Sequence, residues 1–90
     1  MLKVYLVLSM NKNRLQWASR RGMLELDLIL QPFIEDHYDH LGEDDKLRFE
    51  VLLEIEDQQL FAWFMRREQP SDPQMQRIVS IIYESRQRSL

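Results

Sequence analysis

Apolar residues recur at three- and four-residue steps through most of the chain, which is the spacing of one buried helix face. Glycine, proline and polar pairs interrupt the pattern at short intervals. The sequence therefore predicts an all-α protein, a single small five-helix bundle with short connections. The expected helices run from about Asn13 to Arg21, from about Met23 to His40, and onward from Glu43, from Glu56-Asp57 and from Pro73.

The same periodicity predicts which side chains form the core. The expected core positions are Leu15, Ala18, Met23, Leu26, Leu30, Phe33, Ile34, Leu41, Phe49, Leu52, Leu53, Leu60, Phe61, Phe64, Met65, Met75, Ile78, Val79 and Ile82. The third helix is apolar on a second side as well, which is typical of a central helix. The second helix has an opposite face that mixes apolar and acidic groups, either an interaction patch or a surface covered by another helix. That face comprises Glu25, Leu28, Ile29, Pro32 and Asp36.

The eight residues from Arg20 to Asp27, Arg-Arg-Gly-Met-Leu-Glu-Leu-Asp, combine a helix break with opposite charges. Gly22 can enter the left-handed conformation that ends a helix without a Cβ penalty. Arg20 and Arg21 suit the negative end of the first helix. Glu25 and Asp27 suit the positive start of the second. Helix geometry can explain all of these residues, yet the same corner would also be a compact, preorganised docking surface.

Two tryptophans have no decided environment from the pattern alone. Trp17 shares a helix face with Arg14 and Arg21, where a guanidinium can stack on the indole, but a core position explains it equally well. Trp63 departs from the inward face of the fourth helix and is either a core flank or an exposed anchor.

Charge is distributed unevenly over the 90 residues, whose net charge is −3. Residues 1–21 contain five basic groups and no acid, whereas residues 22–57 contain twelve acids and two basic groups. An acidic middle repels phosphates, so nucleic acid is not expected as a partner. A protein partner with complementary patches fits this distribution better.

Residues 1–10 are apolar but too short to span a bilayer, and they lack the pattern of a signal or transit peptide. We treat 1–10 as an unassigned N-terminal arm, either extended or an artefact of start-site choice, and 11–90 as the helical domain. No membrane insertion is expected.

Few residues suggest catalysis or metal binding. The chain has no cysteine, and it contains no phosphate-binding glycine loop, serine elbow or zinc-binding helix motif. His37 and His40 lie among acids at a spacing compatible with a metal site, but ordinary histidines at a solvated helix end explain them better. Residues 43–45 are acids that suit a helix start, and no nucleophile accompanies them. We therefore do not expect an enzyme.

Residues 16–27, Gln-Trp-Ala-Ser-Arg-Arg-Gly-Met-Leu-Glu-Leu-Asp, resemble the signature of the SdhE (YgfY-like) family, the flavinylation factors of succinate dehydrogenase. The whole string in order is more specific than its Arg-Gly-x-x-Glu motif alone. The likeness covers about residues 13–85, and the N-terminal arm does not share it. It continues through Pro32-Phe33, Leu41-Gly42-Glu43-Asp44-Asp45, Phe49, Leu52-Leu53-Glu54, Asp57 and Leu60-Phe61-Trp63.

The resemblance implies a non-enzymatic FAD assembly factor. Family members bind the flavoprotein subunit of succinate dehydrogenase or fumarate reductase and promote covalent attachment of FAD to a histidine of that subunit. FAD would thus be carried by the partner, with none bound tightly by this chain. The implied partner-binding residues are Arg21, Gly22 and Glu25, which match the motif, and Trp17, Arg20 and Asp27, which flank it.

The resemblance also leaves an alternative open. The same family has been described as the antitoxin component (CptB-like) of a bacterial toxin–antitoxin pair. In either role we expect a monomer in the bacterial cytoplasm.

Overall fold

The computed structural model describes residues 12–89, with side chains for residues 14–86. The N-terminal arm lies outside these residues. Within them the chain is all-α, and the five helices expected from the sequence are confirmed. They are α2 (Lys12–Ala18), α3 (Leu24–Asp36), α4 (Glu43–Leu52), α5 (Asp57–Phe64) and α6 (Pro73–Ser89), with a 3-10 turn η1 (Tyr38–His40) after α3.

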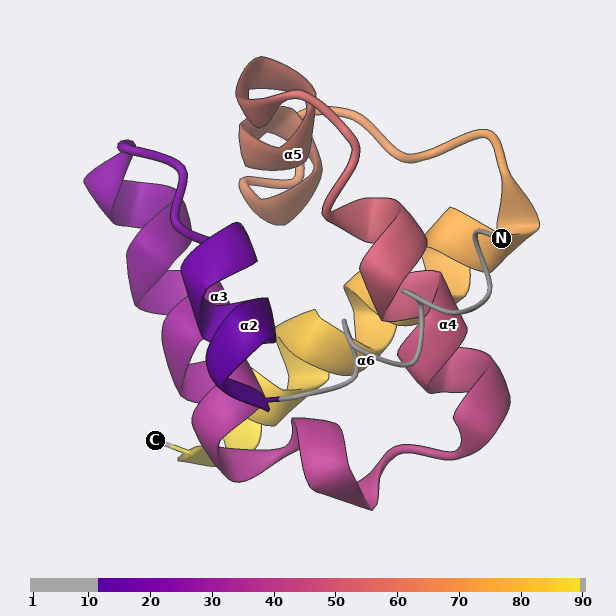
Figure 1. The fold of residues 1–90 in the computed structure, drawn as a ribbon. Helices are drawn as coiled ribbons and strands as arrows, with labels where there is room; N and C mark the ends of the chain where they lie inside the picture. Colours follow the sequence, from indigo (N-terminus) through magenta and orange to yellow (C-terminus); the bar gives the residue numbers. More distant parts are fainter. Residues whose placement is uncertain (1–11, 90) are drawn as a thin grey trace, which may run out of the picture.

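The long helix α6 organises the bundle, because it packs against α3, α4 and α5. In Figure 1 it runs diagonally across the molecule, while α2 lies alongside α3 on one side and α4 lies on the other. The short helix α5 closes the top of this view and also contacts α3. None of the helices within residues 12–89 combines the length and the apolar character needed to cross a bilayer.

The apolar stripes meet in one core, as expected from their spacing. Its fully or nearly buried apolar members are Leu15, Leu26, Ile29, Leu30, Phe33, Ile34, Tyr38, Phe49, Leu52, Leu60, Trp63, Phe64, Met75, Ile78, Val79 and Ile82.

The fifth helix is confirmed in detail: α6 begins at Pro73, whose missing N–H suits a first helical position. Asp72 caps it, because its Oδ1 accepts a hydrogen bond from the backbone N–H of Gln74 at 2.9 Å.

Several core predictions are wrong at the edges of the helices. Ala18 and Met65 are exposed. The mixed face of α3, for which both environments were open, is divided: Ile29 is buried and Leu28 is exposed. The helix α4 has one buried face rather than two, since Leu47 is 44% and Val51 53% exposed. The reason is that α4 packs chiefly on α6, which covers a single side.

The second expected helix is shorter than the periodicity indicates. It ends at Asp36, and the chain tightens through η1 because Tyr38 turns into the core. The Tyr38 ring lies 5.7 Å from that of Phe49, which in turn lies 5.4 Å from that of Phe33. Pro32 does not end the helix, and it is exposed, so water can satisfy the carbonyl that proline leaves unpaired.

Candidate functional site

The corner between α2 and α3 is a five-residue connection rather than a tight helix cap. The helix α2 ends at Ala18, so Gly22 does not occupy the C-cap expected for it. Gly22 does adopt a positive φ of 80°, which confirms the left-handed conformation. The carboxylate of Asp27 accepts a hydrogen bond from the backbone N–H of Arg21 at 2.9 Å, which holds the connection against the start of α3.

A buried serine explains why α2 ends early. The hydroxyl of Ser19 donates to the carbonyl of Gln16 at 3.1 Å and accepts from Nε2 of Gln31 at 2.5 Å. Gln31 also donates to the carbonyl of Gln16, at 3.0 Å, and Gln16 donates to Glu35 at 2.8 Å. A side chain that bonds local carbonyls competes with helix continuation. The result is a polar seam that fixes α2 against α3.

Arg21 points into the molecule. Its side chain is only 13% exposed, and its Nη2 donates a hydrogen bond to the carbonyl of Leu53. Its Nη1 lies 3.7 Å from Oδ1 of Asp57, at the start of α5. The shared face of Arg14, Trp17 and Arg21 is therefore wrong, because Arg21 lies beyond the end of α2.

The other side of the corner faces solvent. Trp17 is 77% exposed, which decides its environment, and Leu24 and Leu28 are 67% and 60% exposed. Leu24, Leu28 and Gln31 follow one another along one side of α3, and Gln31 bonds α2, so these leucines lie next to α2. We group the exposed residues of this region under the name corner face; they are Trp17, Arg20, Gly22, Leu24, Glu25 and Leu28.

The structure thus divides the six predicted site residues. Trp17, Arg20, Gly22 and Glu25 lie on the corner face, whereas Arg21 and Asp27 hold the connection from within. Leu24 was missed by the sequence reasoning. Met23 lies on the apolar stripe, and Leu24, one residue later, is rotated by about 100° away from it. That rotation is the sequence signal that Leu24 does not face the core.

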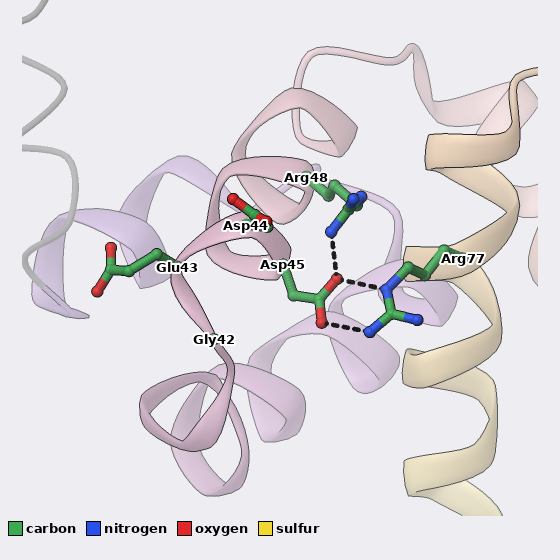
Figure 2. A pocket seen from close by; sticks show the side chains of 6 residues that line it. All are labelled: Gly42, Glu43, Asp44, Asp45, Arg48 and Arg77. Carbon is green, nitrogen blue, oxygen red and sulfur yellow. Dashed lines mark hydrogen bonds and ion pairs between the residues drawn. The ribbon is translucent and has the colours of Figure 1, made fainter.

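A second polar feature lies where α4 begins beside α6, shown in Figure 2. The carboxylate of Asp45 accepts from Nε and Nη2 of Arg77 at 2.8 and 3.0 Å, and from Nη1 of Arg48 at 2.8 Å. These hydrogen bonds, with that of Arg77 foremost, hold the pKa of Asp45 below its usual range. The three side chains line a shallow pocket together with Gly42, Glu43 and Asp44.

Sequence spacing could have indicated only part of this cluster. Asp45 and Arg48 are one helical turn apart, but Arg77 comes from a helix 32 residues away. The cluster acts as a clamp between α4 and α6, because both carboxylate oxygens of Asp45 are already paired with arginines. Elsewhere, within residues 12–89, no group of three or more histidine or acidic side chains is arranged to hold a metal ion. His37 packs on Phe33, with their rings 5.7 Å apart.

Residues 13–86 match the sequence profile of a family described as "Flavinator of succinate dehydrogenase". The chain belongs to this family. The match spans all five helices and includes the entire corner.

Three named relatives are similar to this chain over most of their own length. The FAD assembly factor SdhE of Pseudomonas aeruginosa is 51% identical over 71 residues, which are 79% of this chain and 84% of the relative. That of Shewanella oneidensis is 53% identical over 70 residues, 78% of this chain and 85% of the relative. That of Colwellia psychrerythraea is 47% identical over 76 residues, 84% of each chain.

The relatives are named FAD assembly factors, so FAD is the ligand to compare with this chain, and the pocket at α4 does not fit it. Glu43 and Asp44 would repel the pyrophosphate of a flavin nucleotide. The guanidinium groups of Arg48 and Arg77, which could attract it, are already paired with Asp45. The corner face offers exposed apolar side chains instead, a surface suited to another protein.

Proposed function

We propose that this protein is an FAD assembly factor that binds the flavoprotein subunit of succinate dehydrogenase or fumarate reductase and promotes covalent attachment of FAD to it. In this proposal the chain acts in the bacterial cytoplasm as a non-catalytic monomer, and FAD is carried by the partner. The observation that carries it is the exposed corner face of a chain in the flavinator family.

The composition of the corner face supports docking. Tryptophan, tyrosine and arginine dominate the energetics of protein interfaces, and a buried tryptophan anchor contributes about 2 kcal/mol or more. Trp17 and Leu24 leave most of their apolar surface in water, which a partner would remove. Arg20 and Glu25 add charged groups of both signs, which fix the orientation of a partner.

Rigidity of the corner suggests how binding could promote flavin attachment. The polar seam between α2 and α3 fixes the corner face before any partner arrives, so docking costs little ordering entropy. A rigid surface that binds one arrangement of a flexible partner raises the population of that arrangement. In the proposed mechanism the favoured arrangement holds the partner's histidine close to the flavin, and this chain supplies no reacting group.

The test exploits Gly22 and its matched control Gly42. A Cβ at either glycine would meet no atom within 4 Å, so neither substitution causes a clash at Cβ, although the φ of 80° strains any L-residue at position 22. We expect Gly22→Arg to remain folded and to abolish stimulation of covalent flavin incorporation, because its side chain would project from the corner face into the partner. Gly42→Arg, distant from the corner, should retain full activity.

The measurement is covalent flavin fluorescence of the partner subunit in denaturing gels, with each variant as the sole assembly factor. Normal fluorescence with Gly22→Arg would refute the site, and normal fluorescence with no factor at all would refute the function. Within residues 12–89 no feature specifically favours the antitoxin alternative.

A further inference from the structure

Arg21 is held by contacts that leave little of it for a partner. Its guanidinium donates to the carbonyl of Leu53, approaches the carboxylate of Asp57 at 3.7 Å and is 13% exposed. Its own backbone N–H is bonded to Asp27. The Nε atom is buried without a hydrogen-bond acceptor among the described residues, so it is no outward-facing donor either.

Withdrawing this side chain toward a partner would carry a substantial penalty. The carbonyl of Leu53 would lose its charged donor, and Asp57 would lose the cation beside it. Hydrogen bonds to charged groups are stronger than neutral ones, and half-buried groups without partners are costly. Arg21 therefore stabilises the protein most in its inward position, where it links the corner to the turn that connects α4 to α5.

This turn and the first residue of α5, together residues 53–57, include two exposed acids besides Asp57. Glu54 and Glu56 are both exposed, and neither carboxylate has an ion-pair or hydrogen-bond partner within the described part of the chain. Glu25 on the corner face is likewise exposed and unpaired among these residues. Because Arg21 is turned inward, its positive charge neutralises Asp57 rather than these outer carboxylates.

We propose that Arg21 is a positioning residue: with the Leu53 carbonyl and the Asp57 carboxylate it forms a clamp that joins the 53–57 turn to the corner face as one docking surface. The charge of the exposed carboxylates Glu25, Glu54 and Glu56 suits basic groups on the partner. This inference rests on the proposed function, since the partner is the flavoprotein subunit. It adds the turn to the surface and gives Arg21 an indirect role.

The first test compares variants that break the clamp from either side. Asp57→Asn removes the ion pair without touching the corner face, and Asp44→Asn is its matched control, an acid in the first turn of another helix. We expect Arg21→Ala and Asp57→Asn each to weaken binding to the purified subunit by about tenfold, and the double variant to be no weaker than Arg21→Ala alone. Asp44→Asn should bind as the unaltered protein does.

Hydrogen exchange supplies a readout that does not need the partner. The Arg21 amide should exchange faster in Asp57→Asn, whereas the amides of α6 should be unchanged. Asp45→Asn, which breaks the clamp between α4 and α6, should lower overall stability and leave binding unaltered. That variant separates a local change of the docking surface from general destabilisation.

The second test concerns the acids of the turn. Glu54→Gln combined with Glu56→Gln should weaken binding about tenfold at low salt, and the difference should vanish near 0.5 M NaCl because salt screens surface charge. The pair Glu43→Gln and Asp44→Asn, the same loss of charge elsewhere, should have no effect.

The outcomes distinguish this inference from the proposed function. If Arg21→Ala weakens binding while Asp57→Asn does not, Arg21 contacts the partner directly and the positioning role is wrong. If Asp57→Asn does not speed exchange of the Arg21 amide, the clamp does not hold the corner. If the unaltered protein fails to bind the flavoprotein subunit at all, the proposed function fails, whereas the exchange result still decides the clamp.

Discussion

At the scale of single residues, neighbours with the same side chain have different roles. Arg20 is exposed, whereas Arg21 points into the molecule and bonds the carbonyl of Leu53. Both lie in a non-helical connection, where successive side chains can turn to opposite sides. The sequence marks both arginines as charged and places them at a corner. It does not show which one water reaches.

Gly22 has a conformational requirement that can be measured separately from docking. With φ at 80°, Gly22→Ala should cost about 1 kcal/mol of folding free energy, because an L-residue is disfavoured in this region. Gly42 has φ at −71°, which any L-residue can adopt, so Gly42→Ala should cost less, about 0.5 kcal/mol, which is the N-cap preference for glycine over alanine. Urea denaturation of both variants makes the comparison. Equal losses would mean that backbone conformation does not explain the glycine at 22.

At the scale of elements, polar side chains fix how helices meet. Ser19 and Gln31 join α2 to α3, Arg21 joins the corner to the start of α5, and Asp45 joins α4 to α6. Apolar packing does not by itself fix the relative orientation of two helices. Each of these contacts helps to fix it, because a hydrogen bond requires a particular geometry. The sequence pattern predicts the helices but does not predict these cross-links, whose partners are distant along the chain.

The clamp at Asp45 predicts a dependence of stability on pH. Because its pKa is lowered in the folded protein, Asp45 stabilises the fold above its usual pKa of 3.8, and this contribution is lost as the pH falls further. Asp45→Asn should therefore lower stability at pH 7 by about 1–2 kcal/mol, a modest value because Arg77 is largely exposed.

Thermal unfolding between pH 7 and pH 2 tests the sign of this effect. The difference in melting temperature between Asp45→Asn and the unaltered protein should become smaller below about pH 4, because the carboxylate is protonated there. Asp44 is an exposed neighbour, so the melting temperature of Asp44→Asn should differ less from that of the unaltered protein, and this difference should depend less on pH. A gap that widens in acid would contradict the assignment of Asp45 as a charged clamp.

At the scale of the whole molecule, the two tryptophans report on opposite environments. Trp63 is 9% exposed and belongs to the core, whereas Trp17 is 77% exposed on the corner face. A helical bundle that leaves a tryptophan 77% exposed has a surface available for a partner. The position of Trp17 therefore links the architecture to the proposed docking.

Fluorescence quenching tests this difference directly. Iodide should quench most of the Trp17 emission in Trp63→Phe and little of the Trp63 emission in Trp17→Phe. Addition of the purified flavoprotein subunit should protect Trp17 from iodide, because docking would cover the indole. A bound complex with Trp17 still fully quenched would exclude the corner face as the interface.

Much of the fold could be predicted from local sequence signals. Helix periodicity located all five helices, and Pro73 located the start of α6 to the residue. The errors fall where long-range contacts override local preference. Tyr38 turns into the aromatic cluster and ends α3 early, and Ser19 bonds Gln31 and ends α2 early.

The candidate site was predictable as a stretch of chain but not as a surface. The sequence by itself determined five amphipathic helices, a glycine corner between the first two and the charges around it, because these depend on interactions a few residues apart. Only the tertiary structure decided that Trp17 and Leu24 face solvent, and that Arg21 turns inward to residues more than thirty positions away. Which side of a corner is buried depends on what packs beneath it, and that is settled when distant helices meet.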